Sequence, residues 1–398
     1  MKRIYIVGTA DTKAEELAFL ADAIRALGAI AVLVDVGTTL PALAVDVTAA
    51  DVASFGRQET AAALASGDRG RAVAAMADAF ASFITTRTDI AAVIGIGGGG
   101  GTSIVTAGMR DLPLGLPKIM VSTLASGDVS AYVGVSDIVM MPSITDMAGL
   151  NRISRVILHN AAQAIVGMAA KPASEQDGRP ALGLTMFGVT TPCVTAIGDA
   201  LRSDYDCLVF HATGTGGSTM EKLAASGLLA GILDITTTEI CDLLFGGVLA
   251  AGLDRLDAVA ATKIPYVGSV GALDMVNFWA PETIPERFRG RLFYNHNSNV
   301  TLIRTTADEC RAVGEWIGNK LNACDGPVRF LIPEKGVSAL DIAGGAFFDP
   351  AADSALFEAL EATIRQTDDR RIIRLPLHIN DPKFAEAAVA AFHEIANR

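Results

Sequence analysis

The pattern of apolar and polar positions over the first forty residues predicts a strand, a helix and a second strand. Residues 2–7 alternate as a strand does, and residues 11–27 carry Leu17, Leu20 and Ile24 at helical spacing. Residues 30–36 form a continuous apolar run with one acid, Asp35, near its end. A strand, a helix and a strand within this length form a βαβ unit, which implies a parallel sheet covered by helices.

The same alternation continues along the chain. In the first half it predicts further strands over 90–96, 118–122 and 138–141, and helices over 71–86, 102–112 and 151–169. In the second half it predicts strands over 181–187, 207–211, 231–235, 259–261, 266–270, 291–294, 328–332 and 372–375, and helices over 194–201, 219–225, 238–250, 307–322, 354–364 and 382–395.

A polar stretch over 171–180, with two prolines and one glycine, interrupts this alternation and is typical of a linker. The chain is therefore predicted to be an α/β protein of two Rossmann-like, three-layer domains with mostly parallel sheets. We expect the N-terminal domain to span residues 1–175 and the C-terminal domain to span residues 181–398.

Composition narrows the class of protein. Of the 398 residues, 51% are hydrophobic and 19% are charged, which excludes disorder of the whole chain and supplies large cores. The net charge of −12 argues against binding to nucleic acid, which needs basic patches. No apolar run is long enough to span a membrane, the start lacks the features of a signal peptide, and the five cysteines show no C-x-x-C spacing. We expect a reduced, cytoplasmic protein.

Five consecutive glycines, Gly97–Gly101, follow the strand over 90–96 and precede Thr102 and Ser103. Such a run cannot pack a core and costs conformational entropy, so it is typical of places where a phosphate approaches the backbone. The lysine of a Walker A loop is missing, and the next strand carries no terminal acid for the ribose of a dinucleotide. The pattern favours a cradle for a mononucleotide or phosphorylated metabolite. A dinucleotide site and a purely structural turn are the alternatives.

Polar residues also follow the sibling strands, whose carboxyl ends meet at one edge of a parallel sheet. Thr9 and Thr12 can bond phosphate oxygens, Lys13 can neutralise one, and Asp11 can hold Mg²⁺; the alternative is that Asp11 or Thr12 only caps the helix. Asp35 is a candidate ribose-binding acid. The expected nucleotide site comprises Gly8, Thr9, Asp11, Thr12, Lys13, Asp35, Gly97, Gly98, Gly99, Gly100, Gly101, Thr102, Ser122 and Thr123.

A second glycine loop, Gly214–Gly217, follows the predicted strand that ends at His211. We interpret the two loops as related anion sites, with convergent turn chemistry as the alternative. His211, Glu239 and Lys335 are the catalytic candidates, because they bring acid, base and cationic groups to strand ends in this half. The candidate substrate-binding residues are Thr213, Gly214, Gly216, Gly217, Ser218, His296 and His378. Metal binding by the histidines and separately satisfied histidines are the alternatives.

Many strings resemble one family almost end to end. The sequences at 7–13, 95–103, 121–127, 184–192, 209–214, 233–239, 271–278, 335–341 and 378–381 are similar to the family known by the ATP-binding domain of the tomato mosaic virus resistance protein. The resemblance implies two α/β subdomains, ATP with Mg²⁺ in the N-terminal one, and a homodimer or higher homo-oligomer. The plant member carries a fused TIM-barrel domain, so the resemblance also implies a separately encoded TIM-barrel partner.

These observations lead to a first hypothesis, a metabolic enzyme that uses ATP and Mg²⁺ on a small anionic substrate bound between the two domains. Phosphoryl transfer or ligation is the expected reaction class, because Mg²⁺ and backbone amides can stabilise a transferring phosphoryl group. The alternative is a non-catalytic ATP-binding module whose nucleotide state controls association with a protein partner. An NAD-linked dehydrogenase is the third hypothesis.

Overall fold

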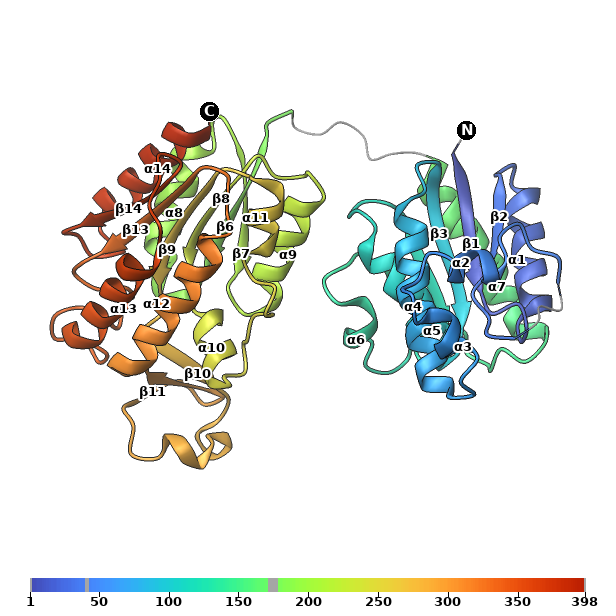
Figure 1. Cartoon of the computed structure of the whole chain (residues 1–398), viewed down its shortest axis with the longest axis horizontal. Helices are drawn as coiled ribbons and strands as arrows, with labels where there is room; N and C mark the ends of the chain where they lie inside the picture. The colour runs from blue at the N-terminus through green and yellow to red at the C-terminus, as the bar shows by residue number, and fades with distance from the viewer. Residues whose placement is uncertain (1, 40–42, 171–177, 397–398) are drawn as a thin grey trace. The chain divides into compact units, whose positions relative to one another are not determined.

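Five strands of the N-terminal half form one parallel sheet in the computed structural model, which describes residues 2–39, 43–170 and 178–396 (Figure 1). The chain divides into one unit of residues 1–175 and a second of residues 176–398. Of the expected linker, residues 171–177 lie outside the described residues.

The strand order of the N-terminal sheet is β2-β1-β3-β4-β5. The strands are β1 (Arg3–Gly8), β2 (Ala31–Asp35), β3 (Ile90–Gly97), β4 (Lys118–Ser122) and β5 (Val139–Pro142), and every pair is parallel. Because β1 pairs with both β2 and β3, the winding reverses between β1 and β3. Ligands of open parallel sheets bind at such a reversal, outside the carboxyl ends of the strands.

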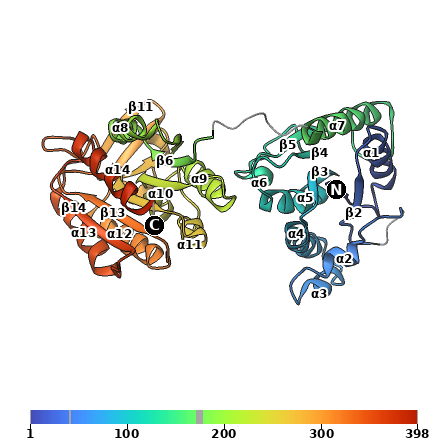
Figure 2. The ribbon, with the colours of Figure 1, turned by 90° about the horizontal axis from the view of Figure 1, so that it is seen from above.

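Helices cover both faces of this sheet, as Figure 2 shows from above. One face packs against α1 (Ala14–Ala26) and α7 (Arg152–Ala170) around Leu17, Leu20 and Leu158. The other packs against α4 (Arg69–Thr85) and α5 (Gly99–Asp111) around Phe80, Phe83 and Val105. The short helices of this unit are α2 (Ala49–Ala53), α3 (Thr60–Leu64) and α6 (Ser130–Val133).

The C-terminal unit contains a larger parallel sheet with the order β14-β13-β9-β8-β6-β7. Its strands are β6 (Ala181–Met186), β7 (Asp206–His211), β8 (Gly231–Thr236), β9 (Tyr266–Gly271), β13 (Val328–Pro333) and β14 (Arg370–Leu375). Counted along the chain, the first strand again lies between the second and the third. The two sheets therefore share one winding scheme, and the C-terminal sheet has one strand more.

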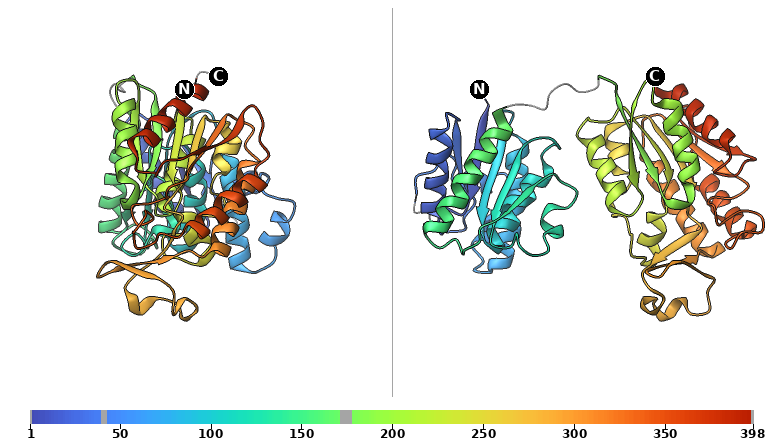
Figure 3. Two further views of the ribbon diagram at one scale, coloured as in Figure 1. Left: turned by 90° about the vertical axis from the view of Figure 1, so that its left-hand side faces the viewer. Right: turned by 180° about the vertical axis from the view of Figure 1, so that it is seen from behind.

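Helices α8 (Thr191–Leu201) and α14 (Pro382–Ala396) cover one face of the C-terminal sheet (Figure 3). The opposite face carries α9 (Thr215–Ala225), α10 (Glu239–Phe245), α11 (Asp257–Thr262), α12 (Ala307–Leu321) and α13 (Pro350–Thr363). A small antiparallel sheet adjoins them, formed by β10 (Met275–Phe278), β12 (Val300–Arg304) and β11 (Phe293–Asn297). Among the described helices, none combines the length and apolarity that crossing a membrane requires.

The expected fold class, α/β with parallel sheets, is confirmed, but some elements differ. The strand predicted over 259–261 is wrong, because these residues lie in α11, an alanine-rich helix whose short apolar run does not reveal its period. The helix predicted to begin at Thr102 begins at Gly99, so three glycines form its first turn. Strands β10 and β12 were not predicted, and the helix predicted over 238–250 ends at Phe245, before the left-handed Gly246.

Candidate functional site

A cavity of about 350 Å³ lies where the loops after β1, β2 and β3 converge in the N-terminal unit. Parallel strands bring these loops to one edge of the sheet, at the reversal of winding. Eight of the expected nucleotide-site residues line this cavity: Thr9, Asp11, Thr12, Lys13, Gly98, Gly99, Gly100 and Gly101. The structure adds Thr38, Thr39, Arg69, Val73 and Ile104, which were not predicted.

The glycine run forms the N-terminus of α5 and faces the cavity with its backbone. Gly98 is the N-cap residue, no described side chain caps the helix, and Thr102 N–H donates to the Gly98 carbonyl at 2.8 Å. The amides of the three residues between them precede this first helical hydrogen bond, so they have no intrahelical acceptor. They point to the cavity at the positive end of the helix dipole.

The glycines at 99, 100 and 101 are not required by the fold itself. A Cβ atom added at these positions would have its nearest neighbours at 3.8, 3.4 and 3.7 Å, which are ordinary contacts. At Gly100 a Cβ atom would lie beside Val73 and Arg69, and at Gly101 beside Thr9, and all three of these neighbours line the cavity. Gly97 differs, since its Cβ would lie 2.9 Å from the backbone of Gly101. Glycine is thus needed for folding at 97, whereas side chains at 100 and 101 would stand beside residues that line the cavity.

Two cations face this helix end. Lys13 is the N-cap residue of α1 and Arg69 is the first residue of α4, and neither forms an ion pair with a described residue. An arginine at the N-terminus of a helix opposes the helix dipole, which favours acidic side chains there. That unfavourable placement was the sequence signal that could have identified Arg69. The two cations and the α5 amides give this part of the cavity lining a positive electrostatic character.

Asp11 adds the one acidic group of the cavity. Its Oδ2 accepts hydrogen bonds from the Thr39 N–H at 3.2 Å and from the Thr39 hydroxyl at 2.7 Å. Its Oδ1 is buried and accepts no hydrogen bond from the described residues. Asp11 does not cap α1, which begins at Ala14 without a side-chain cap. The orphaned oxygen fits a hydrogen-bond donor or a cation, while no group of three potential metal ligands occurs among the described residues.

The other expected residues shape the loops and do not line the cavity. Asp35 is buried, its Oδ1 accepts the Ala10 and Gly37 amides at 2.8 Å each, and burial raises its pKa. The ribose-binding role expected for Asp35 is therefore not supported by its position. Gly8, Thr102, Ser122 and Thr123 are also not among the residues that line the cavity. The hydroxyls of Thr102 and Ser122 are 2.7 Å apart, and the Thr123 amide donates to the Gly97 carbonyl at 3.3 Å.

The second glycine loop is filled by the protein's own carboxylate. The Gly214 amide donates to Glu239 Oε2 at 2.7 Å, and a Cβ atom at Gly217 would collide with Glu239 Oε1. A Cβ atom at Gly216 would collide with the His211 carbonyl. This loop follows the second strand of its sheet, whereas the Gly97 loop follows the third. The two loops are thus not equivalent, and the interpretation as related anion sites is not supported.

Glu239 belongs to a buried cluster around Arg255. The guanidinium donates to Glu239 Oε1 at 2.6 Å, to Glu221 Oε1 at 2.7 Å and to both oxygens of Asp234 at 2.9 and 2.7 Å. Burial raises the pKa of Glu221 and of Glu239. A buried carboxylate with both oxygens bonded holds α9 and α10 together, so this geometry gives Glu239 a structural role. Thr213 lies in the loop before α9, and Ser218 lies in its first turn.

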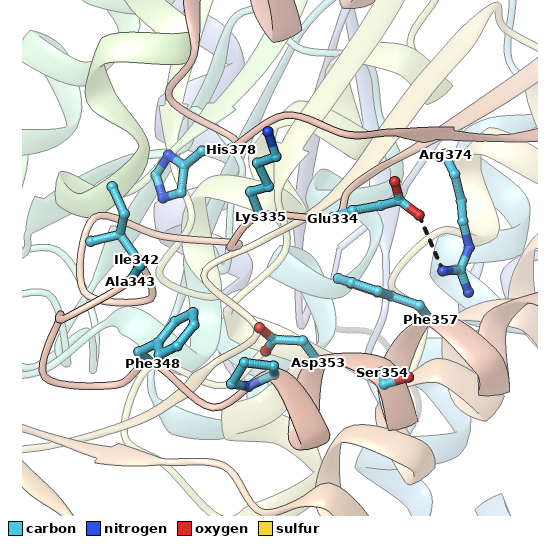
Figure 4. A pocket seen from close by; sticks show the side chains of 11 residues that line it. Glu334, Lys335, Ile342, Ala343, Phe348, Asp353, Ser354, Phe357, Arg374 and His378 are labelled. Atoms are coloured by element: carbon cyan, nitrogen blue, oxygen red, sulfur yellow. Dashed lines mark hydrogen bonds and ion pairs between the residues drawn. The ribbon is translucent and has the colours of Figure 1, made fainter.

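A second cavity, of about 520 Å³, lies at the carboxyl ends of β13 and β14 and brings Lys335 and His378 together (Figure 4). His378 Nε2 contacts the Ser338 carbonyl at 2.9 Å, and Nδ1 accepts the Asn380 amide at 3.1 Å. These partners assign the neutral tautomer with the proton on Nε2.

His211 and His296 do not line this cavity. His211 ends β7 and its ring packs 5.2 Å from that of Phe187, where burial lowers its pKa. His296 is exposed on β11. The structure therefore separates the catalytic and substrate-binding candidates into different places in the C-terminal unit, and among the described residues the three histidines form no metal site.

These features define a class of protein: two parallel α/β units, each with a cavity at the carboxyl ends of its strands. The chain belongs to the family described as Uncharacterised protein family (UPF0261), whose N-terminal domain matches residues 2–174 and whose C-terminal domain matches residues 179–396. This finding confirms the resemblance noted from the sequence.

Relatives of this family cover the whole chain. A UPF0261 protein of Rhizobium meliloti is 70% identical and one of Mesorhizobium japonicum is 72% identical, with 100% of each chain covered. The ToMV resistance protein Tm-1 of Solanum lycopersicum is 41% identical over 99% of this chain, which spans 56% of the tomato protein. A glycosyltransferase of Streptomyces sp. SF2575 aligns with a TM-score of 0.20 and 13% identity over 100% of this chain and 95% of its own, a likeness too weak to inform on function.

Proposed function

We propose that the N-terminal unit binds ATP together with Mg²⁺, with the triphosphate at the N-terminus of α5. The observation that carries this proposal is the glycine backbone at 100 and 101, where the fold would accept a Cβ atom beside residues that line the cavity. The family resemblance favours ATP among the phosphorylated ligands that such a cradle suits.

Different residues around the cavity would hold different parts of the triphosphate. The α5 amides donate to phosphate oxygens, as helix N-termini do in phosphate sites. Lys13 and Arg69 neutralise the phosphate charge, and neither has to give up an ion pair with a described residue to do so. The cavity volume falls within the range of about 300–1,000 Å³ typical of small-molecule sites.

Asp11 fits Mg²⁺ as a single protein ligand. Mg²⁺ is commonly held by one or two carboxylates plus phosphates and waters, so one orphaned carboxylate oxygen suffices. When bound, the ion supplies charge neutralisation on the triphosphate. Asp11 itself stays oriented by Thr39, which bonds its other oxygen.

Bound ATP would serve phosphoryl transfer or ligation on a small anionic substrate, the reaction class that needs positioning and charge stabilisation more than covalent chemistry. The alternative is a non-catalytic module whose nucleotide state controls association with a protein partner. The comparison that favours it is the tomato relative, in which the matched region is 56% of the protein and is joined to a further segment.

Isothermal titration of the full chain with ATP and Mg²⁺ tests the binding proposal. We expect Lys13→Met and Arg69→Met each to weaken binding about tenfold or more, since hydrogen bonds to charged groups contribute about 1.5–3 kcal/mol. Arg71→Met, on the same helix but outside the cavity, is the matched control and should bind as the wild type does. Flat titrations of the folded wild type with ATP would refute the proposal.

A further inference from the structure

The C-terminal cavity is larger than the nucleotide cavity and is built from three segments. Glu334 and Lys335 follow β13, and His378 follows β14. The loop over 342–349 leads into α13, which contributes Asp353 and Phe357. The carboxyl ends of parallel strands are the usual ligand edge of such a sheet. Its volume of about 520 Å³ is well within the range of small-molecule sites.

The side walls of this cavity are apolar and partly uncovered. Ile342 and Phe348 are each 45% exposed, although both are large hydrophobic side chains that gain from being covered. Phe357 is 4% exposed and closes the opposite wall (Figure 4). A ligand with an apolar part would bury the exposed faces of these side chains.

The charges lining the cavity leave one cation unbalanced. Arg374 pairs with Glu334 at 3.3 Å and with Glu361 at 2.7 Å, so its charge is compensated. Lys335 is exposed at the rim and forms no ion pair with a described residue. An anionic group of a ligand would compensate this ammonium.

Across the cavity from Lys335, the carboxyl group of Asp353 faces the enclosed space (Figure 4). It lies in a buried group of three carboxyls around the single guanidinium of Arg304, which pairs with Asp353 at 2.7 Å and lies 3.9 Å from Asp341. Asp274 Oδ1 and Asp341 Oδ1 accept no hydrogen bond from the described residues. One guanidinium cannot neutralise three buried carboxylates, so the group must retain protons.

The titration behaviour agrees with this geometry. Burial and the adjacent Asp341 raise the pKa of Asp353 to about 8, and burial raises the pKa of Asp274 to about 7. A protonated carboxyl group is a hydrogen-bond donor. At neutral pH Asp353 is therefore uncharged, with its proton shared with Asp341, and the ammonium of Lys335 is the charged group left for a ligand.

We propose that this cavity is a second ligand site, for a small organic acid that carries an apolar tail. Lys335 pairs with the ligand carboxylate, and the uncharged Asp353 does not repel it. Phe348 and Ile342 cover the apolar tail. The site lies entirely within the C-terminal unit, so the proposal does not depend on nucleotide binding by the N-terminal unit.

Isothermal titration of the full chain without nucleotide tests the proposal with two probes, 4-methyl-2-oxopentanoate and phenylpyruvate. One analogue serves as the ligand control, 4-methylpentan-2-one, which lacks the carboxylate. We expect at least one oxo acid to bind, with 4-methylpentan-2-one binding at least tenfold more weakly than 4-methyl-2-oxopentanoate.

Three exposed positions provide the protein variants. Lys335→Met should weaken binding of the acids at least tenfold, whereas Lys383→Met, an exposed lysine outside the cavity, should not change it. Ala343→Trp should abolish binding by filling the cavity from its exposed wall.

The proposal is overturned if neither oxo acid binds the wild type, or if Lys335→Met and Ala343→Trp bind as the wild type does. Titration with ATP and Mg²⁺ in the same samples reports on the N-terminal unit separately, so failure of one site is distinguishable from failure of the other.

Discussion

The side chain of Glu239 reaches from α10 into the glycine loop that begins at Gly214, and its Oε2 accepts a hydrogen bond from the Gly214 amide at 2.7 Å. A carboxylate of the chain itself thus occupies the place that an external anion would take. The corresponding approach to the Gly97–Gly101 segment is open, and a cavity lies before it. The two loops look alike in sequence, yet only the N-terminal one has room for a ligand.

Replacing Glu239 with glutamine is predicted to destabilise the C-terminal unit. The amide nitrogen of Glu239→Gln cannot accept a hydrogen bond, so either the Arg255 guanidinium or the Gly214 amide loses a buried partner. We expect a loss of about 1–3 kcal/mol in unfolding free energy, measured by urea denaturation. ATP affinity should be unchanged, and an unchanged midpoint would contradict the structural role.

An alanine in the α5 glycine run is predicted to weaken ATP binding without harming the fold. Gly100→Ala adds a Cβ atom at an ordinary 3.4 Å from Val73, in the space that a phosphate would use. We expect at least a tenfold loss of ATP affinity by calorimetry, with unchanged or raised thermal stability, since alanine favours helix over glycine by about 1 kcal/mol.

Gly167→Ala is the matched control for that variant. Gly167 lies in α7, and its Cβ atom would meet nothing within 4 Å. The Gly167→Ala variant should gain thermal stability and keep the ATP affinity of the wild type. Equal ATP affinity of Gly100→Ala and Gly167→Ala would contradict the proposal that the α5 glycine run binds the phosphates.

Asp11→Asn is predicted to remove the Mg²⁺ dependence of ATP binding. The wild type should bind ATP more tightly with Mg²⁺ than in the presence of a chelator, because Asp11 lines the cavity and is the proposed ligand of the ion. The variant should bind both forms alike, whereas Asp22→Asn, on the exposed side of α1, should behave as the wild type. A retained Mg²⁺ effect in Asp11→Asn would exclude Asp11 as the metal ligand.

The stability of the C-terminal unit is predicted to fall as the pH rises from 4 to 7. Asp274 is buried, and its pKa is raised from 3.8 to about 7, so the native state holds a proton that the unfolded chain releases in this window. Unfolding is then favoured by rising pH, because the native state binds more protons. Above pH 7 both states are ionised and this contribution becomes constant.

Asp274→Asn tests that relation. The amide is neutral at every pH, can still accept the Ser338 hydroxyl and can offer its NH₂ group to the acidic cluster. We expect a shallower fall in unfolding free energy between pH 4 and pH 7 than in the wild type, measured by urea titration at several pH values. An identical slope would show that Asp274 does not titrate there.

Most of the architecture was predictable, because helix and strand periods are read from neighbours along the chain. The parallel strands ending at Gly8, Gly97 and His211 follow from continuous apolar runs bounded by glycine and polar residues. Two kinds of element were exceptions. The apolar run at 259–261 lies in the helix α11, and so few residues fit the period of a helix or of a strand. The short strands β10 and β12 depend on pairing with each other, which no local pattern reveals.

The candidate nucleotide site was predictable in part for the same reason. Parallel strands gather the ends of β1 and β3 at one edge, so Thr9, Asp11 and Lys13 were expected beside the glycine run. Arg69 comes from the start of a helix that crosses to this edge, and only the packing of α4 against α5 brings it there.

The amino-acid sequence alone determined two parallel α/β units, a backbone cradle after the third strand and a family membership carried by long matching strings. Tertiary structure decided which cradle is open, since Glu239 reaches the Gly214 loop from 25 residues away. It also decided that Lys335 and His378 share a cavity while His211 and His296 lie elsewhere. Periodicity depends on contacts within a few residues, whereas burial, pairing of charges and empty space arise only when distant segments pack together.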